Sequence, residues 1–324
     1  MRAEPGGPAR TGTSAPLEHD PDYWGFGVSW GTPGGGAGCG RESRAVFGAE
    51  VVLGDVVSGA GVEQALEGVD LVIHLAGTTK ALAADDYYAG NVRATEKVAL
   101  AVAARGIRMV HVSSLAAARP SLDGTPVREE DEARPLTHYG KSKLEGERIV
   151  RQLVPDAVIV RPPVVYGPRD TDVFQILKPL TQGIALQIGG GERWFSAIYV
   201  GDLVEGLIAA SSASGGTYFL ANGTPVSWSG LREATARIVG RNARVVRVPA
   251  PMAYAAGLGA EVWARLTGKP GIISREKVAE AQCPYWTCDT GRAAAEIGFE
   301  ARTSLDAGLA QTLQWYREAG WLKY

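Results

Sequence analysis

Short aliphatic runs alternate with helical patterns along most of the chain, and this alternation constrains the fold more than any other feature. Residues 70–75, 108–112 and 157–161 have the length and the β-branched content of buried strands. Residues 91–105 and 139–153 have the pattern of helices. Strands that alternate with helices pack as βαβ units around a parallel sheet. The sequence therefore predicts an α/β fold with a doubly wound parallel sheet, which carries helices on both faces.

The alternation weakens after about residue 170, which predicts a second unit. We expect residues 46–170, together with about 196–225, to form the α/β domain. About 171–195 and 226–324 would form a smaller C-terminal α+β substrate domain. Residues 1–45 supply no aliphatic strand, so we expect an aberrant, poorly ordered segment there. Further helices are predicted at 62–66, 173–181, 201–210, 253–266 and 304–319, and further strands at 50–53, 194–199 and 244–248.

Charge and composition exclude several classes of function. The formal net charge is −2 and no basic stripe is visible, so we expect neither a nucleic-acid nor an anionic-membrane partner. Three cysteines are a sparse, odd set that suits a reducing compartment. The four histidines lack metal-ligand spacing, so no metal site is predicted. Because the chain has no run of eighteen apolar residues and no basic-then-apolar start, we expect a soluble, cytoplasmic protein.

Three side chains are candidates for acid-base chemistry. Tyr139 and Lys143 lie one turn apart on the same face of the predicted helix 139–153, and Ser114 follows the strand before it. An ammonium close to a phenol lowers the tyrosine pKa from about 10 toward the working pH, where acid-base catalysis is efficient. A serine at the carboxyl end of a strand lies where open α/β sheets bind ligands. Such a tyrosine and lysine also occur on exposed helices without function, so the surrounding motifs decide.

Ordered motifs surround these residues along the chain. They are Gly54-Asp55-Val56, the hexapeptide Val-Ile-His-Leu-Ala-Gly at 72–77, Asn91-Val92, Ser113-Ser114, Tyr139 to Lys143, Arg161-Pro162-Pro163, Val165-Tyr166-Gly167-Pro168 and Tyr199-Val200-Gly201-Asp202. Together they resemble the extended short-chain dehydrogenase/reductases, a family that includes NAD-dependent epimerases and dehydratases of nucleotide sugars and reductases of steroids and flavonols. The resemblance runs from about Gly48 to the C-terminus. It implies a Rossmann-type dinucleotide-binding domain followed by a substrate domain.

The resemblance also implies roles for single residues. Ser114 would orient the substrate oxygen, Tyr139 would act as acid and base, and Lys143 would bind the nicotinamide ribose and lower the tyrosine pKa. The expected cofactor is NAD or NADP. Its predicted contacts are Asp55 and Val56 at the adenine, Leu75, Ala76 and Gly77 along the ribose and phosphates, Asn91 bracing the strand beneath, Pro163 near the nicotinamide, and Ser113, Val165, Tyr139 and Lys143. Relatives are commonly homodimers, so a homodimer is a further expectation.

The beginning of the chain departs from the family pattern. The family has a strand, a Gly-x-x-Gly-x-x-Gly loop and a helix whose amino end binds the pyrophosphate. Residues 34–40 are rich in glycine but follow no aliphatic strand, and a glycine cluster without that context is weak evidence. The strand whose end selects NAD or NADP is missing as well. We therefore expect the chain as written to bind dinucleotides weakly or not at all.

The genetic code offers an explanation for this departure. Back-translation of residues 22–33, read one nucleotide later, permits Ile-Thr-Gly-Ala-Ser-Gly-Phe-Leu-Gly-Ala-His-Leu, which has the form of the missing loop. We hypothesise that the first βα unit is translated out of frame. The alternative is that Trp-Gly steps force glycine in the shifted frame of any gene, and the coding DNA of residues 20–48 decides between the two.

The prediction of the substrate class depends on residues of the C-terminal part of the chain. Nucleotide-sugar members of the family carry an arginine shortly before the segment at Tyr199, where it clamps the diphosphate. Here Phe195 occupies that position and Arg193 is displaced by two residues. We predict an NAD(P)-dependent oxidoreductase that acts on a secondary alcohol or ketone, in a sugar nucleotide or another hydroxyl or keto compound. Two alternatives stay open: a nucleotide-sugar epimerase or dehydratase with tightly bound NAD, and an inactive dinucleotide-binding or scaffold protein whose phosphate-binding loop is lost.

Overall fold

A four-stranded parallel sheet forms the centre of the N-terminal part of the computed structural model, which describes residues 52–268 and 274–324. Its strands are β1 (Leu71–His74), β2 (Arg108–Val112), β3 (Val158–Val160) and β8 (Gly216–Tyr218). They pair in the order β1-β2-β3-β8, and all three pairings are parallel. The predicted parallel α/β sheet is confirmed, with β1 at its edge in the described part of the chain.

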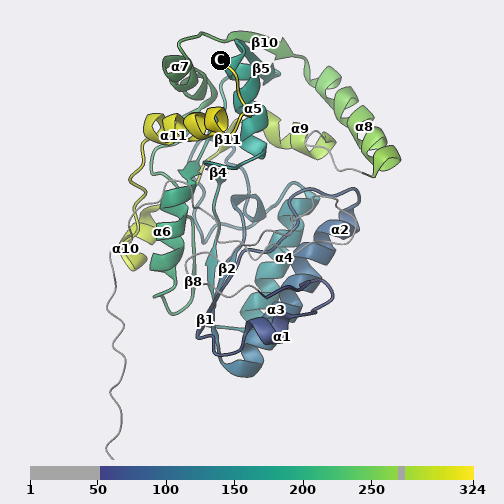
Figure 1. Cartoon of the computed structure of the whole chain (residues 1–324), viewed down its shortest axis with the longest axis vertical. Helices are drawn as coiled ribbons and strands as arrows, with labels where there is room; N and C mark the ends of the chain where they lie inside the picture. Colours follow the sequence, from purple (N-terminus) through teal and green to yellow (C-terminus); the bar gives the residue numbers. More distant parts are fainter. Residues whose placement is uncertain (1–51, 269–273) are drawn as a thin grey trace, which may run out of the picture.

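Helices cover both faces of this sheet (Figure 1). On one face, α1 (Val62–Ala65), α3 (Ala94–Arg105) and α4 (His138–Leu153) share one apolar cluster with the sheet. On the other face, α6 (Val200–Ala210) and α10 (Gly291–Ile297) pack in a second cluster. This is the doubly wound arrangement that the sequence predicted.

The C-terminal part of the chain surrounds a third apolar cluster, in which Leu177, Leu313 and Tyr316 are fully buried. Its helices are α5 (Asp172–Thr181), α7 (Trp228–Val239), α8 (Ala250–Thr267), α9 (Arg275–Gln282) and α11 (Leu305–Glu318). Its strands are β5 (Ile184–Ile188) with β10 (Arg244–Val248), and β6 (Trp194–Phe195) with β9 (Val226–Ser227) and β11 (Tyr285–Trp286). A separate pair, β4 (Val164–Tyr166) with β7 (Ala197–Tyr199), joins the two parts.

The position of α4 decides where the candidate catalytic residues lie. Its first turn is capped by the Thr137 hydroxyl, which accepts a hydrogen bond from the Gly140 amide at 3.2 Å. A β-carbon on Gly140 would lie only 2.2 Å from the Ala116 carbonyl oxygen. Only glycine therefore allows α4 to approach the segment that follows β2 so closely.

A buried ion pair ties α4 to the sheet. Glu147 on α4 is fully buried and accepts two hydrogen bonds from the Arg161 guanidinium, at 2.8 and 2.7 Å. Arg161 directly follows β3 and is itself 3% exposed. The Ser113 hydroxyl, at the end of β2, donates to the same carboxylate at 2.6 Å. One carboxylate thus connects α4 with the carboxyl ends of two neighbouring strands.

Several predicted elements differ from the structure. Val52 and Leu53 form no strand, and Leu53 is 85% exposed; residues 50 and 51 lie outside the described residues, as does the predicted segment 1–45. The predicted strand 194–199 is divided at Ser196, because the chain there leaves β6 and its sheet to pair as β7 with β4. Helix α10 belongs by sequence to the predicted substrate domain but packs on the parallel sheet.

Removing the Glu147 carboxylate should destabilise the fold strongly. Glu147→Ala leaves Arg161 buried without its partner, and breaking a buried pair in this way costs about 3–5 kcal/mol. Urea unfolding followed by circular dichroism measures the loss. Glu145→Ala on the same helix is the matched control, because Glu145 pairs with Arg148 at the exposed surface, where a pair contributes about 0–1 kcal/mol. Similar losses for the two variants would contradict the role of the buried pair.

Candidate active site

The three candidate catalytic residues come together at the carboxyl end of β2. Ser114 lies two residues after the strand and begins the short helix η2 (Leu115–Ala117). Its side chain hydrogen-bonds to Tyr139 in the first turn of α4. One turn further along α4, Lys143 is 4% exposed and donates from Nζ to the Val112 carbonyl at 2.7 Å. The hydroxyl, the phenol and the ammonium therefore lie where the sequence predicted.

The electrostatics of Tyr139 differ from the prediction. Burial raises the pKa of Tyr139, and the hydrogen bond with Ser114 opposes this shift in part. The cation that also lowers its pKa is Lys277, whose Nζ lies 5.8 Å from the centre of the Tyr139 ring. The Lys143 ammonium binds the Val112 carbonyl, and the lowering of the Tyr139 pKa by Lys143 stays a prediction. A phenol with a raised pKa is protonated at neutral pH, but it gives up its proton less readily than one whose pKa lies near the working pH.

Lys143 is buried at the end of β1. Burial lowers its pKa from 10.5 to about 8, while the nearby charge of Glu147 acts in the opposite direction. A β-carbon on Gly77 would lie 3.4 Å from the Lys143 Nζ and 2.7 Å from Asn91 Oδ1. Gly77 therefore lies directly beside the ammonium, where the sequence predicted a cofactor contact.

Asn91 fixes the segment that contains Gly77. It lies in η1 (Ala89–Arg93), a π-helical turn after α2 (Ala84–Tyr88), and is 1% exposed. Its Oδ1 accepts the Thr78 amide at 2.8 Å, and its Nδ2 donates to the Thr78 carbonyl at 3.0 Å and to Ser142 Oγ at 2.9 Å. Asn91 thus connects the segment after β1 with α4. π-Helical turns are frequent at functional sites.

The remaining predicted cofactor residues fall into two groups. Leu75 and Gly77 are exposed and Ala76 is half-buried, so these three offer a surface at the end of β1. The residues of the other group make contacts within the protein or are partly buried. The Asp55 carboxylate accepts hydrogen bonds from the amides of Val57 and Ser58, and Val56 is 5% exposed in the core. The Ser113 hydroxyl donates to Glu147 and its amide donates to the Val160 carbonyl, while Pro163 and Val165 are half-buried in and next to β4.

The sequence analysis missed a helix of the C-terminal part that closes over Tyr139. Glu276 on α9 accepts the His138 amide, at 3.0 and 3.1 Å to its two oxygens. Glu280, one turn later, accepts from the Thr137 hydroxyl at 3.2 Å and pairs with Lys277 at 2.8 Å. Two carboxylates thus lie at the amino end of α4, where the helix dipole favours negative charge. Glu280 also holds Lys277, whose ammonium lies over the ring of Tyr139.

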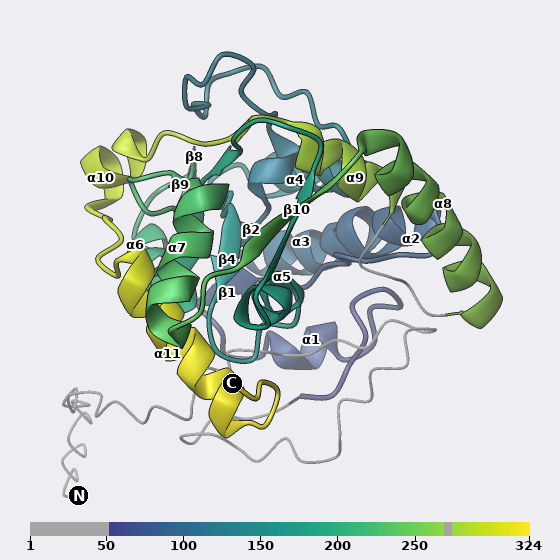
Figure 2. The same ribbon diagram turned by 90° about the horizontal axis from the view of Figure 1, so that it is seen from above.

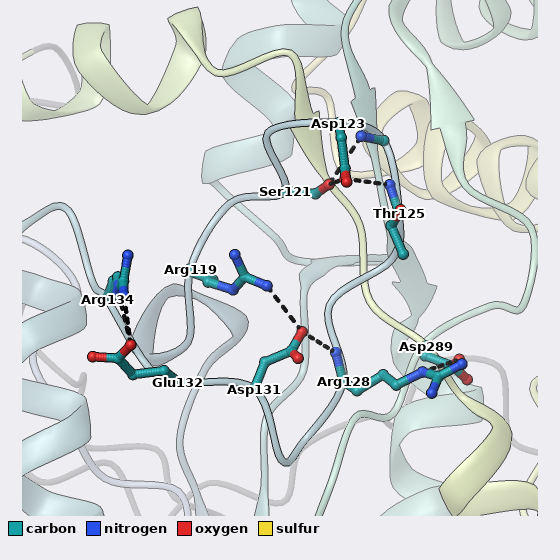
Figure 3. A network of polar contacts seen from close by, with 10 residues as sticks. Arg119, Ser121, Asp123, Thr125, Arg128, Asp131, Glu132, Arg134 and Asp289 are labelled. Carbon is teal, nitrogen blue, oxygen red and sulfur yellow. Dashed lines mark hydrogen bonds and ion pairs between the residues drawn. The ribbon is translucent and has the colours of Figure 1, made fainter.

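The loop between Ser114 and Tyr139 is ordered by its own polar side chains (Figure 3). Asp131 accepts from the Arg119 guanidinium at 3.2 Å and from the Arg128 amide at 3.0 Å. Arg128 in turn lies 3.5 Å from the Asp289 carboxylate, and the Val127 amide donates to Thr287 of the C-terminal part. These contacts give a fixed path to the chain that delivers Tyr139 to Ser114.

The positions expected to bind a diphosphate are used otherwise. Phe195 packs against the apolar cluster of the C-terminal part. Arg193 donates from Nε to the Ala281 carbonyl at the end of α9, at 3.3 Å. Neither side chain provides an arginine clamp next to Tyr199.

Residues 52–268 and 274–324 were searched for metal-binding clusters and for helices that could span a membrane. This part of the chain holds no cluster of histidine, cysteine and carboxylate side chains that could bind a metal ion. Cys283 and Cys288 are free thiols, while Cys39 lies outside the described residues. None of the described helices is long and apolar enough to cross a bilayer.

Comparison with known proteins gives matches over most of the chain. Residues 40–256 match the family described as the RmlD substrate binding domain. The ceramide reductase of Caulobacter vibrioides is 30% identical over 284 residues, which cover 84% of this chain and 82% of that protein. The 4-hydroxy-2-methyl-3-oxo-4-farnesyl-3,4-dihydroquinoline-1-oxide ketoreductase of Stigmatella aurantiaca is 30% identical over 81% of this chain and 82% of that protein. The N-acetyl-alpha-D-glucosaminyl-diphospho-ditrans,octacis-undecaprenol 4-epimerase of Escherichia coli is 27% identical over the same shares.

Solved structures share the fold. The crystal structure of gox2253 superposes with a TM-score of 0.71 at 24% identity and covers 87% of this chain and 89% of that chain. The UDP-glucuronic acid 4-epimerase of Bacillus cereus, solved in complex with NAD, gives a TM-score of 0.66 at 18% identity and covers 81% of this chain and 79% of that chain. These similarities confirm the Rossmann-type α/β fold class.

Burial of Lys143 should make the stability of the protein without cofactor depend on pH. Above pH 8 the folded state loses the Lys143 proton while the unfolded state keeps it up to about pH 10.5. The unfolded state then binds more protons, so this contribution to stability rises with pH by about 1.4 kcal/mol per unit. The free energy of unfolding of the wild type, measured relative to Lys143→Met, should therefore increase by about 2 kcal/mol between pH 8 and 9.5. Lys141→Met, on the exposed side of the same helix, is the matched control, and a parallel change in both variants would contradict the assignment.

Proposed function

Because the chain belongs to the extended short-chain dehydrogenase/reductases, the family of NAD-dependent epimerases and reductases, we propose that it transfers hydride between NAD or NADP and a secondary alcohol or ketone. The observation that carries this proposal is the convergence of Ser114, Tyr139 and Lys143 at the carboxyl end of β2. Open α/β sheets bind their ligands at this edge.

The residues at the end of β1 fit a dinucleotide. Ala76 and Gly77 are small, Gly77 lies beside the buried Lys143, and Asn91 holds the segment in place. A bound NAD(P) would give or take the hydride. In this proposal Lys143 donates to the ribose hydroxyls, and Leu75, Ala76 and Gly77 line the same side of the cofactor. The loop that binds the pyrophosphate in the family has no counterpart in the sequence as written.

The proton follows a short path in the proposed reaction. In the direction of reduction, Ser114 donates a hydrogen bond to the substrate carbonyl oxygen and Tyr139 transfers its proton to the same oxygen. Burial keeps the phenol protonated at neutral pH, so proton transfer requires a positive charge that stabilises the phenolate. The charge that develops on the phenolate would be stabilised by Lys277 from above the ring and by Lys143 through the ribose.

The substrate is proposed to be a lipophilic molecule with a hydroxyl or keto group. Three relatives have names that refer to ceramide, to a farnesylated quinoline and to an undecaprenol-linked sugar. The absence of an arginine clamp near Tyr199 in the described structure also favours such a molecule over a free sugar nucleotide. Epimerisation with tightly bound NAD is the second candidate, which the undecaprenol 4-epimerase supports; NAD that copurifies with the protein would favour it.

Removal of the Tyr139 hydroxyl should abolish most of the turnover. Tyr139→Phe keeps the ring but removes the proton donor, and acid-base catalysis contributes about 10²- to 10⁴-fold to a rate. The assay follows NADH or NADPH oxidation with a panel of long-chain ketones, at dinucleotide concentrations high enough to compensate weak binding. We expect a loss of this size in kcat.

The matched control is Tyr88→Phe, which removes a hydroxyl from a ring that packs edge-on against His138. It should retain the wild-type rate. Equal turnover by wild type and Tyr139→Phe would contradict the proposed acid. Absence of turnover by the wild type with every ketone would favour the inactive dinucleotide-binding or scaffold alternative.

A further inference from the structure

Helix α8 carries large apolar side chains on its outer surface. Figures 1 and 2 both place it at the periphery of the molecule, with α9 on its inner side. Its eighteen residues contain only two charged side chains, Glu261 and Arg265. A helix that is apolar around most of its circumference is normally buried or in contact with lipid, and α8 is not buried.

The inner face of α8 is specified by small residues. Ala253, Gly257 and Ala264 are buried and Ala260 is half-buried, at the spacing of one helical stripe. A β-carbon on Gly257 would lie 3.0 Å from the Arg275 amide nitrogen at the start of α9. The Glu261 carboxylate accepts from that amide at 2.8 Å and from the Arg275 guanidinium at 3.0 Å. The orientation of α8 on α9 is therefore fixed.

This orientation turns the large apolar residues outward. Leu258, Val262 and Leu266 follow one another at intervals of four residues, opposite the small-residue stripe, and are 49%, 50% and 77% exposed. Met252 and Trp263 lie beside them and are 63% and 69% exposed. A group of large apolar side chains that is exposed in this way marks an interaction site.

The strand that leads into α8, and its partner strand, also carry exposed apolar side chains. In the parallel pair of β10 with β5, Val246 is in register with Leu186, and their side chains are 42% and 51% exposed. Ile184, two residues before Leu186 and on the same face of the pair, is 43% exposed. The segment from β10 to the end of α8 thus carries apolar side chains in both of its elements.

The same segment is basic, in contrast to the whole chain. Residues 241–268 contain four arginines and one glutamate, which gives a formal charge of +3 in a chain whose net charge is −2. Arg241, Arg244 and Arg247 are exposed, and none of them forms an ion pair within the described ranges. The arginines on and before β10 and the apolar face of α8 with its tryptophan together supply the two attractions that bind a protein to an anionic bilayer, which are charge and buried apolar area.

We propose that this segment, α8 with β10, docks on the surface of a bilayer that contains anionic lipids. The outward face of α8 enters the interface in the plane of the membrane, and the arginines of β10 contact the headgroups. A second copy of the chain fits less well, because a two-fold interface on this segment would bring the same basic strand toward itself. The proposal departs from the expectation of no membrane partner, which rested on the charge of the whole chain.

Docking in this way would place the candidate active site near lipid. Helix α9, on which α8 packs, holds Lys277 over Tyr139. A long-chain substrate could then leave the bilayer along α8 and α9 and reach the phenol. This last step rests on the proposed function, whereas docking itself does not.

Co-sedimentation of the full chain with vesicles tests the docking. We expect binding to phosphatidylcholine vesicles that contain phosphatidylglycerol, and much weaker binding to phosphatidylcholine alone. The double variant Trp263→Glu with Leu266→Glu should weaken binding by about tenfold or more, because both side chains are exposed and their removal leaves the core intact. Arg244→Glu with Arg247→Glu should remove the preference for the anionic vesicles.

Ile208→Glu is the matched control, because Ile208 is 59% exposed on α6, on the other side of the molecule from α8. It should bind vesicles like the wild type. Wild-type protein that stays in the supernatant would overturn the proposal, as would a double variant that binds unchanged. Light scattering that shows a dimer in the wild type and a monomer in the double variant would identify the face as a protein interface instead. The assay needs no turnover, so its result is independent of whether the proposed reaction is correct.

Discussion

The buried ion pair between Glu147 and Arg161 is the interaction on which the site depends. It joins α4 to the end of β3, and the hydroxyl of Ser113 adds the end of β2 to the same carboxylate. Lys143 lies one turn before Glu147 and Tyr139 one turn before Lys143, so the position of this one carboxylate sets both. Ser114 follows Ser113 directly. The charged cluster therefore fixes all three candidate catalytic groups relative to the sheet, at the cost of burying a carboxylate and a guanidinium.

A second set of carboxylates connects the acid-base site with the C-terminal part. Glu276 and Glu280 of α9 bind the amino end of α4, and the same helix carries Lys277. Helix α9 is therefore in direct contact with the helix that carries Tyr139. It also joins the reaction site to the apolar surface of α8.

The sequence predicted the features that depend on local pattern. The strands at 70–75, 108–112 and 157–161 and the helix with Tyr139 and Lys143 were found within a few residues, since aliphatic runs and helical spacing are visible along the chain. β8 was missed because its three residues include a glycine and show no alternation. Lys277 was missed because only the fold brings it to Tyr139, and no spacing links the two. The basic charge of residues 241–268 was hidden by averaging over the whole chain.

We propose that the chain contains the acid-base half of a hydride-transfer site, and we expect the half that binds the cofactor phosphates to be missing from its reading frame. Titration with NAD(H) and NADP(H), followed by fluorescence, tests this most directly. It compares the chain as written with a chain whose first segment is translated from the shifted frame. We expect weak or absent binding by the chain as written and about micromolar or tighter binding by the restored chain. About micromolar binding by the chain as written would contradict it.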